Sequence, residues 1–191
     1  MNKKTQKIVM VGILSAIVFV LQFVSMWIRT STFSITLSLV PIVIGAALYG
    51  KWIGAWLGGV FSIAVFVTGD AAFFLTINPL GTILTVVCKG ILAGFAVGLV
   101  YELIRKKKND TIATYISGLL APIVNTGVFI IGCYLFFFDM IKENTGSGNT
   151  FKYILVTFVG FNFFIELAVN LILSPTIVRI LKIIKKSNKI K

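Results

Sequence analysis

Long apolar runs separated by short polar breaks dominate this chain. Each run approaches the roughly 20 residues that a helix needs to cross a bilayer, and none shows the two-residue alternation of membrane β-strands. The pattern predicts an all-α integral membrane protein with six transmembrane helices in a single membrane domain spanning residues 1–191. The helices are expected at about residues 8–28, 33–50, 52–69, 79–104, 112–138 and 151–184.

Composition agrees with lipid as the solvent. Hydrophobic residues make up 58% of the 191 residues and charged residues 13%, and the mean hydropathy is +1.00. A soluble domain with this composition would lack the polar residues needed to cover its surface. The first run, residues 8–28, is too long for a signal peptide's apolar region and no A-x-A cleavage site follows it, so it is expected to be a retained helix.

The net charge of +12 comes largely from three basic clusters, at Lys3, Lys4 and Lys7, at residues 105–108 and at residues 179–191. A basic chain could bind nucleic acid, but these clusters lie just outside apolar runs, where the cytoplasmic flanks of membrane helices carry Lys and Arg. We therefore expect both termini in the cytoplasm, weak attraction to anionic lipid, and no nucleic-acid partner. The expected location is the plasma membrane of a bacterium.

Small residues are abundant in the first three predicted helices. Gly12-x-x-x-Ala16 and Gly54-x-x-x-Gly58 have the spacing that lets two helices approach closely. Such a motif can serve packing within the protein, which is the more common use, or docking against the helices of a partner. For Gly12 and Ala16 both interpretations stay open.

Polar residues gather in the last three predicted helices. Lys89 lies 16 residues before Arg105, which places it roughly 24 Å from the cytoplasmic end of its helix, in the outer half of the membrane. Asn78 and Thr85 share its helical face with Thr82. Asn125 follows Pro122, which is expected to kink the fifth helix and free carbonyl groups. In the sixth helix Asn162, Glu166 and Asn170 are spaced by four.

An ionisable residue inside a membrane helix is costly and normally faces the bundle interior, where it is paired or used. Lys89 and Glu166 could form a structural pair that fixes helix register. Alternatively they line a polar cavity between helices four to six, open to the outside, in which the lysine favours an anionic ligand group. The predicted substrate-binding residues are Lys89, Asn125, Glu166, Asn170, Asn78, Thr85 and Asn162.

Catalytic and metal chemistry finds little support. The chain has no histidine, and Cys88 and Cys133 lie inside apolar runs, where they are expected to be buried hydrophobes. Only Glu166 is a deep acid. We predict no catalytic residue, no metal and no cofactor, and therefore no enzyme. The functions left open are small-molecule transport, including a stand-alone ion-coupled carrier, and a non-transport membrane scaffold protein.

Four segments resemble a known family, the substrate-binding S components of energy-coupling factor (ECF) vitamin transporters. The first runs from Leu39-Val-Pro-Ile-Val-Ile-Gly-Ala-Ala-Leu-Tyr-Gly50 to Gly54-Ala-Trp-Leu-Gly-Gly59. The others are Asn78-Pro-Leu-Gly-Thr82 with Lys89-Gly90, then Ala121-Pro-Ile-Val-Asn-Thr126, and residues 162–170. The resemblance covers nearly the whole chain.

The resemblance implies a vitamin or similar micronutrient bound near the outer face by helices four to six. It also implies docking through helices one to three onto a transmembrane T component that joins two ATPase subunits, with Gly12-x-x-x-Ala16 as the closest match to the family's small-residue docking pattern. No phosphate-binding Gly-rich loop followed by Lys-Ser/Thr occurs here, so ATP hydrolysis would come from the partners. Lys89, together with several Asn and Thr side chains, suits a small carboxylate such as pantothenate.

Overall fold

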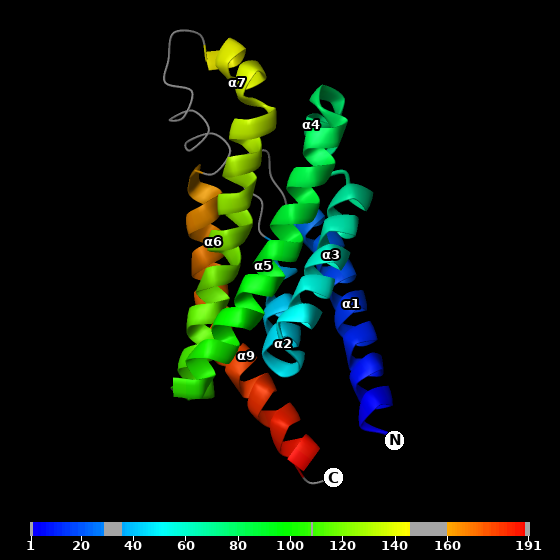
Figure 1. Cartoon of the computed structure of the whole chain (residues 1–191), viewed down its shortest axis with the longest axis vertical. Coiled ribbons are helices and arrows are strands. Elements are labelled where there is room, and N and C mark those ends of the chain that lie inside the picture. Colours follow the sequence, from blue (N-terminus) through cyan, green and yellow to red (C-terminus); the bar gives the residue numbers. More distant parts are fainter. Residues whose placement is uncertain (1, 29–35, 108, 146–159, 190–191) are drawn as a thin grey trace.

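A computed structural model describes residues 2–28, 36–107, 109–145 and 160–189, and every regular element in these ranges is an α-helix (Figure 1). Four helices are long and apolar enough to cross a membrane, whereas α2 and α3 are shorter apolar helices. The elements are α1 (Lys3–Ile28), α2 (Leu39–Tyr49), α3 (Lys51–Val67), α4 (Ala72–Ile77), α5 (Pro79–Lys107), α6 (Asp110–Phe136), α7 (Phe138–Thr145) and α9 (Gly160–Lys189).

The helix ends follow local chemistry that explains where they differ from the sequence pattern. Asn109 caps α6 by accepting a hydrogen bond from the backbone N–H of Ile112, so this helix begins two residues earlier than expected. Gly50 has a φ of +92°, a conformation open to glycine, and it turns the chain from α2 directly into α3. A turn precedes α2, which therefore begins only at Leu39. The apolar stretch before Asn78 forms the short helix α4.

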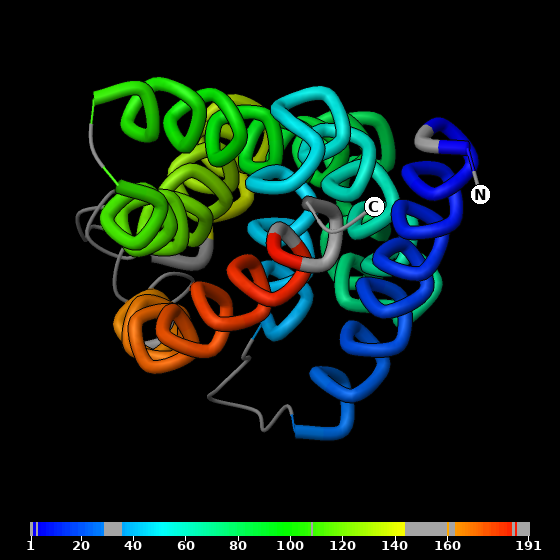
Figure 2. The backbone as a smooth tube through the Cα atoms, turned by 90° about the horizontal axis from the view of Figure 1, so that it is seen from below, coloured from blue at the N-terminus to red at the C-terminus, as the bar shows by residue number. Residues whose placement is uncertain are grey.

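Helix α2 is the central element of the bundle. Eight of its eleven residues are buried, and it contacts α1, α3, α5, α6 and α9. Viewed from below in Figure 2, it lies between α1 and α9. A helix that is apolar on every side belongs in the interior, so α2 is enclosed by protein while the longer helices form the outer wall.

Helices α3 and α5 run antiparallel with their backbones in contact. A Cβ atom on Gly54 would lie 2.2 Å from the carbonyl oxygen of Gly94, and one on Gly58 would lie 2.0 Å from that of Gly90. Ser62 fastens the same contact, because its Oγ donates to the carbonyl oxygen of Val86 at 2.8 Å. Gly54 and Gly58 are thus used for packing within the protein, and we call this contact the glycine seam.

Helix α1 carries the other small-residue motif, Gly12-x-x-x-Ala16, on its outward face. Leu14, Val18 and Gln22 form its buried face, whereas Gly12 and Ala16 are exposed. No atom lies within 4 Å of a Cβ built on Gly12. The motif that the sequence left open therefore has no partner within the described part of the chain.

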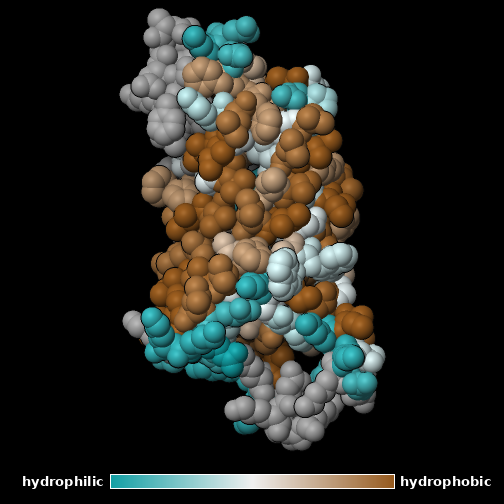
Figure 3. Space-filling model, viewed as in Figure 1, coloured by the Kyte–Doolittle hydropathy of each residue, from teal (hydrophilic) through white to brown (hydrophobic). Residues whose placement is uncertain are grey.

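The surface is divided as a membrane requires. Figure 3 shows a broad apolar band across the middle of the face in view, with hydrophilic residues gathered towards its two ends. Large apolar side chains are exposed on several helices, among them Leu80 of α5 and Ile172 of α9, each 72% exposed. In lipid such residues face a solvent as apolar as themselves, so the band is the lipid-facing surface.

Candidate functional site

Lys89 lies inside the bundle, between three helices. Its Nζ atom is 5.8 Å from the ring centroid of Phe61 on α3 and 5.4 Å from that of Phe129 on α6. The side chain is half-buried on α5. Aromatic faces attract a cation, so the two rings hold the ammonium without neutralising its charge.

Two acids act electrostatically on Lys89: Glu166 of α9 and Asp70, which follows α3. Within the part of the chain that the structure describes, Glu166 makes no direct ion pair with Lys89. Its carboxylate accepts a hydrogen bond from the Thr36 hydroxyl instead. The interaction between Lys89 and Glu166 therefore acts across a distance, and the ammonium keeps donor capacity that a tight ion pair would have used.

A hydrogen-bond network ties α1 to the segment that leads into α2. The Gln22 amide donates to the carboxylate of Asp70, and the Ser38 hydroxyl donates to Gln22 Oε1 at 3.1 Å. The backbone N–H of Leu37 donates to Ser25 Oγ at 3.2 Å. Together with the Thr36–Glu166 bond, these contacts join four parts of the chain beside Lys89.

Sequence reasoning missed Gln22, Thr36 and Asp70. Gln22 carried a signal, since it is the one amide side chain in the apolar run 8–28 and such residues usually hydrogen-bond within a bundle. Thr36 stood near the start of the predicted helix 33–50 and Asp70 in the polar break after the next one, where a polar residue is unremarkable. Their partners lie 130 and 48 positions away in the sequence, so only the fold brings them together.

Buried amides extend the polar cluster along α9 and α6. Asn170 is 1% exposed, and its Nδ2 donates to the carbonyl oxygen of Glu166 at 2.9 Å, which fixes the orientation of the amide. Asn125 is 6% exposed and stands one turn before Phe129. In the described structure neither Asn170 Oδ1 nor Asn125 Oδ1 has a hydrogen-bond partner. Buried acceptors of this kind normally bind a donor from water or a ligand.

The remaining predicted site residues have other positions. Asn78 precedes α5 and caps it, because Oδ1 accepts from the backbone N–H of Gly81 at 2.9 Å while Nδ2 donates to the carbonyl oxygen of Phe136. Thr85 is buried against Gly132 of α6, and its hydroxyl donates to the carbonyl oxygen of Gly81. Both fix the placement of α5. The side chain of Asn162 lies outside the described residues.

An apolar outer wall around an interior cluster of charged and amide side chains is typical of a multi-pass membrane protein. The sequence profile of the ECF transporter substrate-specific component matches residues 6–178, which is most of the chain. The chain belongs to this family. A search of curated proteins gives no match.

Membership defines the broad activity. Members are substrate-specific subunits of ECF transporters, not enzymes. They bind a small-molecule substrate in the membrane and work with transmembrane and ATPase partners.

Proposed function

We propose that this chain captures a vitamin or related micronutrient at the outer face of a bacterial plasma membrane. A transmembrane T component and two ATPase subunits would then drive its import. The observation that carries the proposal is Lys89, whose ammonium lies among α3, α5 and α6 without a direct ion pair to Glu166. A charge kept inside a membrane bundle in this way is suited to a ligand group of opposite sign.

The proposed ligand is a small carboxylate of the pantothenate kind. Its carboxylate would accept from the ammonium of Lys89, while hydroxyl or amide groups would donate to Asn125 Oδ1 and Asn170 Oδ1, two buried acceptors without a partner among the described residues. The ligand carboxylate would replace Glu166 as the main negative charge acting on Lys89. Glu166 would keep its hydrogen bond from Thr36. Asn162 would complete the α9 side of the site, and Asn78 and Thr85 would position Lys89 by anchoring α5.

Partner docking is proposed for the exposed face of α1. Gly12 and Ala16 leave a shallow strip on which a helix of the T component could lie close to the α1 backbone. This face points away from the residues by which α1 packs on its own bundle, so docking would leave the glycine seam and the polar cluster unchanged.

Substitution of Lys89 tests the ligand site. Small molecules that copurify with the protein are identified by mass spectrometry, and pantothenate is titrated as the first probe. Lys89→Met removes a charge-assisted hydrogen bond worth about 1.5–3 kcal/mol, so we expect affinity to fall about tenfold to a hundredfold with an unchanged melting temperature. Lys89→Arg should restore binding in part, because the planar guanidinium differs in shape from the ammonium.

Lys51→Met is the matched control. Lys51 also lies over an aromatic ring, with its Nζ 5.6 Å from the Phe95 centroid, but at the opposite end of α3. We expect normal ligand binding from this variant. If Lys89→Met binds normally and melts much lower, the lysine is a structural counter-charge and the site assignment is wrong.

The proposed orientation places both termini in the cytoplasm. Reporter fusions after residue 108 and after residue 191 should report cytoplasm, and one between residues 145 and 149 should report the exterior, because basic flanks are retained inside. An exterior signal at residue 108 would overturn the orientation and with it the outer location of Lys89.

A further inference from the structure

A polar cavity lies at the end of α5 that carries the basic turn, away from Lys89. It is open to the surface, has a volume of about 510 Å³ and is lined by the last turn of α2, by Gly50, and by Tyr101, Glu102, Arg105 and Lys106 of α5. Glu102 follows Lys89 by 13 residues along α5, which corresponds to roughly 20 Å. The cavity is therefore separate from the proposed substrate site.

The cavity stands at the edge of the apolar band. The apolar stretch of α5 gives way to Arg105, Lys106 and Lys107 at this level, and these three side chains are exposed. A membrane helix with this pattern has its basic turn among the lipid headgroups. Whatever occupies the cavity therefore meets both the headgroup layer and the ester-linked beginnings of the acyl chains.

One wall of the cavity is electronegative. The carbonyl oxygen of Ala46 accepts from the backbone N–H of Gly50, but the helix stops there because Gly50 turns the chain. The carbonyl groups of the next three residues are those that a helix end leaves without intrahelical donors. Glu102 adds a carboxylate beside them, and its Oε1 accepts from the backbone N–H of Lys51 at 3.3 Å. This wall suits an ammonium group.

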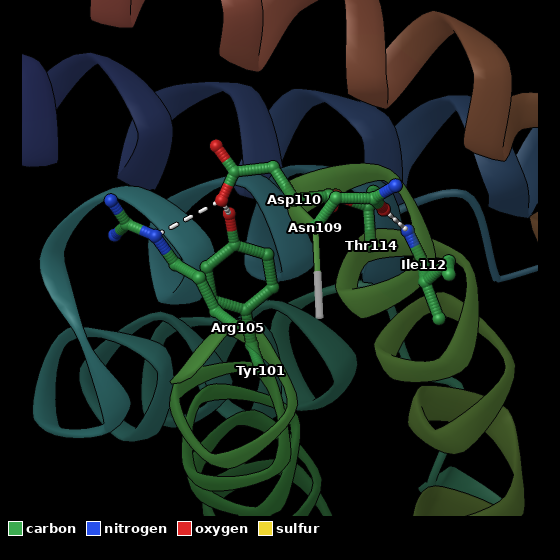
Figure 4. Close-up of polar contacts among 6 residues, drawn as sticks. All are labelled: Tyr101, Arg105, Asn109, Asp110, Ile112 and Thr114. Carbon is green, nitrogen blue, oxygen red and sulfur yellow. Dashed lines mark hydrogen bonds and ion pairs between the residues drawn. The ribbon is translucent and has the colours of Figure 1, made fainter. Parts of the chain in front are cut away.

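Another part of the lining, one turn further along α5 from Glu102, is electropositive. Arg105 pairs through Nε with Asp110 Oδ1 at 3.0 Å, and the same oxygen accepts from the Tyr101 hydroxyl at 3.1 Å (Figure 4). The terminal amino groups of Arg105 point away from this pair in Figure 4. Lys106 supplies a second cation on the rim. Arginine and lysine arranged in this way bind phosphate.

We propose that this cavity binds the headgroup of a phospholipid that carries a primary ammonium next to its phosphate, as phosphatidylethanolamine does. The ammonium donates to Glu102 and to the carbonyl groups at the end of α2, while the phosphate accepts from Arg105 and Lys106. The acyl chains then lie against the apolar band. Such a lipid would bridge α2 and α5 at the cytoplasmic end of the bundle and is independent of the substrate bound at Lys89.

Competition between lipids tests the proposal. The purified full chain is mixed in detergent with equal amounts of phosphatidylethanolamine, phosphatidylglycerol and phosphatidylcholine of identical acyl chains, and retained lipids are counted by native mass spectrometry. Phosphatidylglycerol lacks the ammonium, and the quaternary group of phosphatidylcholine cannot donate a hydrogen bond. We expect phosphatidylethanolamine to be preferred about tenfold, the effect of one charge-assisted hydrogen bond. Equal retention of the three lipids would overturn the proposal.

Two substitutions separate the walls. Glu102→Gln keeps an amide oxygen to accept from Lys51 and removes the charge, so it should abolish the preference for phosphatidylethanolamine at an unchanged melting temperature. Lys106→Gln should weaken the retention of all three phospholipids several-fold, because each carries a phosphate. Lys107→Gln is the matched control, since it removes the same charge one residue further along α5, outside the cavity lining. If both lysine variants lose lipid equally, diffuse surface charge explains binding and the site is rejected.

The source of the headgroup is tested with glycerophosphoethanolamine, which has the same polar groups without acyl chains. We expect it to leave the bound lipid in place at equal concentration. If it displaces the lipid, the cavity serves a soluble phosphoamine and the lipid assignment is overturned. If an added T component displaces the lipid and binds equally well to the Glu102→Gln and Lys106→Gln variants, the cavity is part of a protein interface instead.

Discussion

The same small-residue spacing occurs in α1 and α3, and the fold uses the two motifs in opposite ways. Gly54 and Gly58 of α3 lie so close to α5 that no side chain fits between the helices. Gly12 and Ala16 of α1 have open space in front of them. Spacing therefore predicts that a helix can be approached closely, but which helix approaches it depends on the partner's surface.

The difference lies in what α5 offers to α3. Its own Gly90 and Gly94 repeat the four-residue spacing in antiparallel register, so carbonyl groups of each helix reach the other's glycines. No described helix offers such a surface to Gly12. One motif is therefore part of the fold, and the other is left for an interaction between chains.

The largest expected effect follows from filling the glycine seam. Gly58→Leu places a Cβ atom 2.0 Å from the carbonyl oxygen of Gly90, and neither backbone can yield without separating the helices. We expect destabilisation of about 3 kcal/mol, the upper end for overpacking in a close-packed interior. The melting temperature and the yield of monodisperse protein measure this. A variant with the stability of the parent protein would show that the seam opens freely.

The same change at Gly12 should affect assembly and not folding. A Cβ on Gly12 meets no described atom within 4 Å and Ala16 is exposed, so the melting temperature and ligand affinity of Gly12→Leu and Ala16→Leu should stay unchanged. Copurification with the T component should be lost, because a leucine prevents close approach of the partner's backbone. Loss of binding and stability together would show that this face packs within the protein and would remove the contrast with Gly58.

A smaller effect is expected from the hydrogen bond that crosses the seam. Ser62→Ala removes the bond from Oγ to the carbonyl oxygen of Val86, which is buried with it. Interhelical bonds in membranes average about 0.6 kcal/mol, so we expect a loss of roughly 0.5–1 kcal/mol in an unfolding titration. A loss as large as that of Gly58→Leu would mean that the hydrogen bond, and not the steric fit, holds α3 to α5.

The smallest effect should come from the residue next to the seam. A Cβ on Gly59 has Ile91 Cγ1 as its nearest neighbour at 3.9 Å, an ordinary contact. Gly59→Ala should leave ligand binding unchanged and stabilise α3 by up to about 1 kcal/mol, since alanine favours helix more than glycine does. A marked loss of stability would show that α3 tolerates no added side chain on either face.

The all-helical fold was predictable because the length of an apolar run is a local property of the sequence, whereas the six spans and the orientation of the termini stay predictions. The breaks at Gly50 and at Asn78-Pro79 could be recognised from residue type alone, and both separate helices in the structure. The late start of α2 could not be predicted, because Phe33, Ile35 and Leu37 continue its apolar run towards the N-terminus. In the structure the turn at residues 37–38 sets the start of the helix.

The polar cluster was predictable in part for the same reason. Lys89 and Glu166 stand out in apolar surroundings and could be recognised individually. The hydrogen bond that Glu166 accepts comes from Thr36, 130 positions away, and only the fold brings the two together. Asn78 illustrates the converse, since a polar residue before a proline can be either a ligand contact or a helix cap, and its hydrogen bonds decide for the cap.

Helix α2 has a further electrostatic consequence. Its eleven residues span about 16 Å, roughly half of the apolar thickness of a bilayer, so both of its ends lie within or near the membrane. Its peptide dipoles sum to about half a positive charge at the end beside Thr36 and Glu166, and to half a negative charge at the end beside Glu102. The central helix thus acts as a buried, fixed dipole whose positive pole faces the proposed carboxylate site and whose negative pole faces the proposed ammonium site. Any tilt of α2 relative to the membrane would alter both potentials at once.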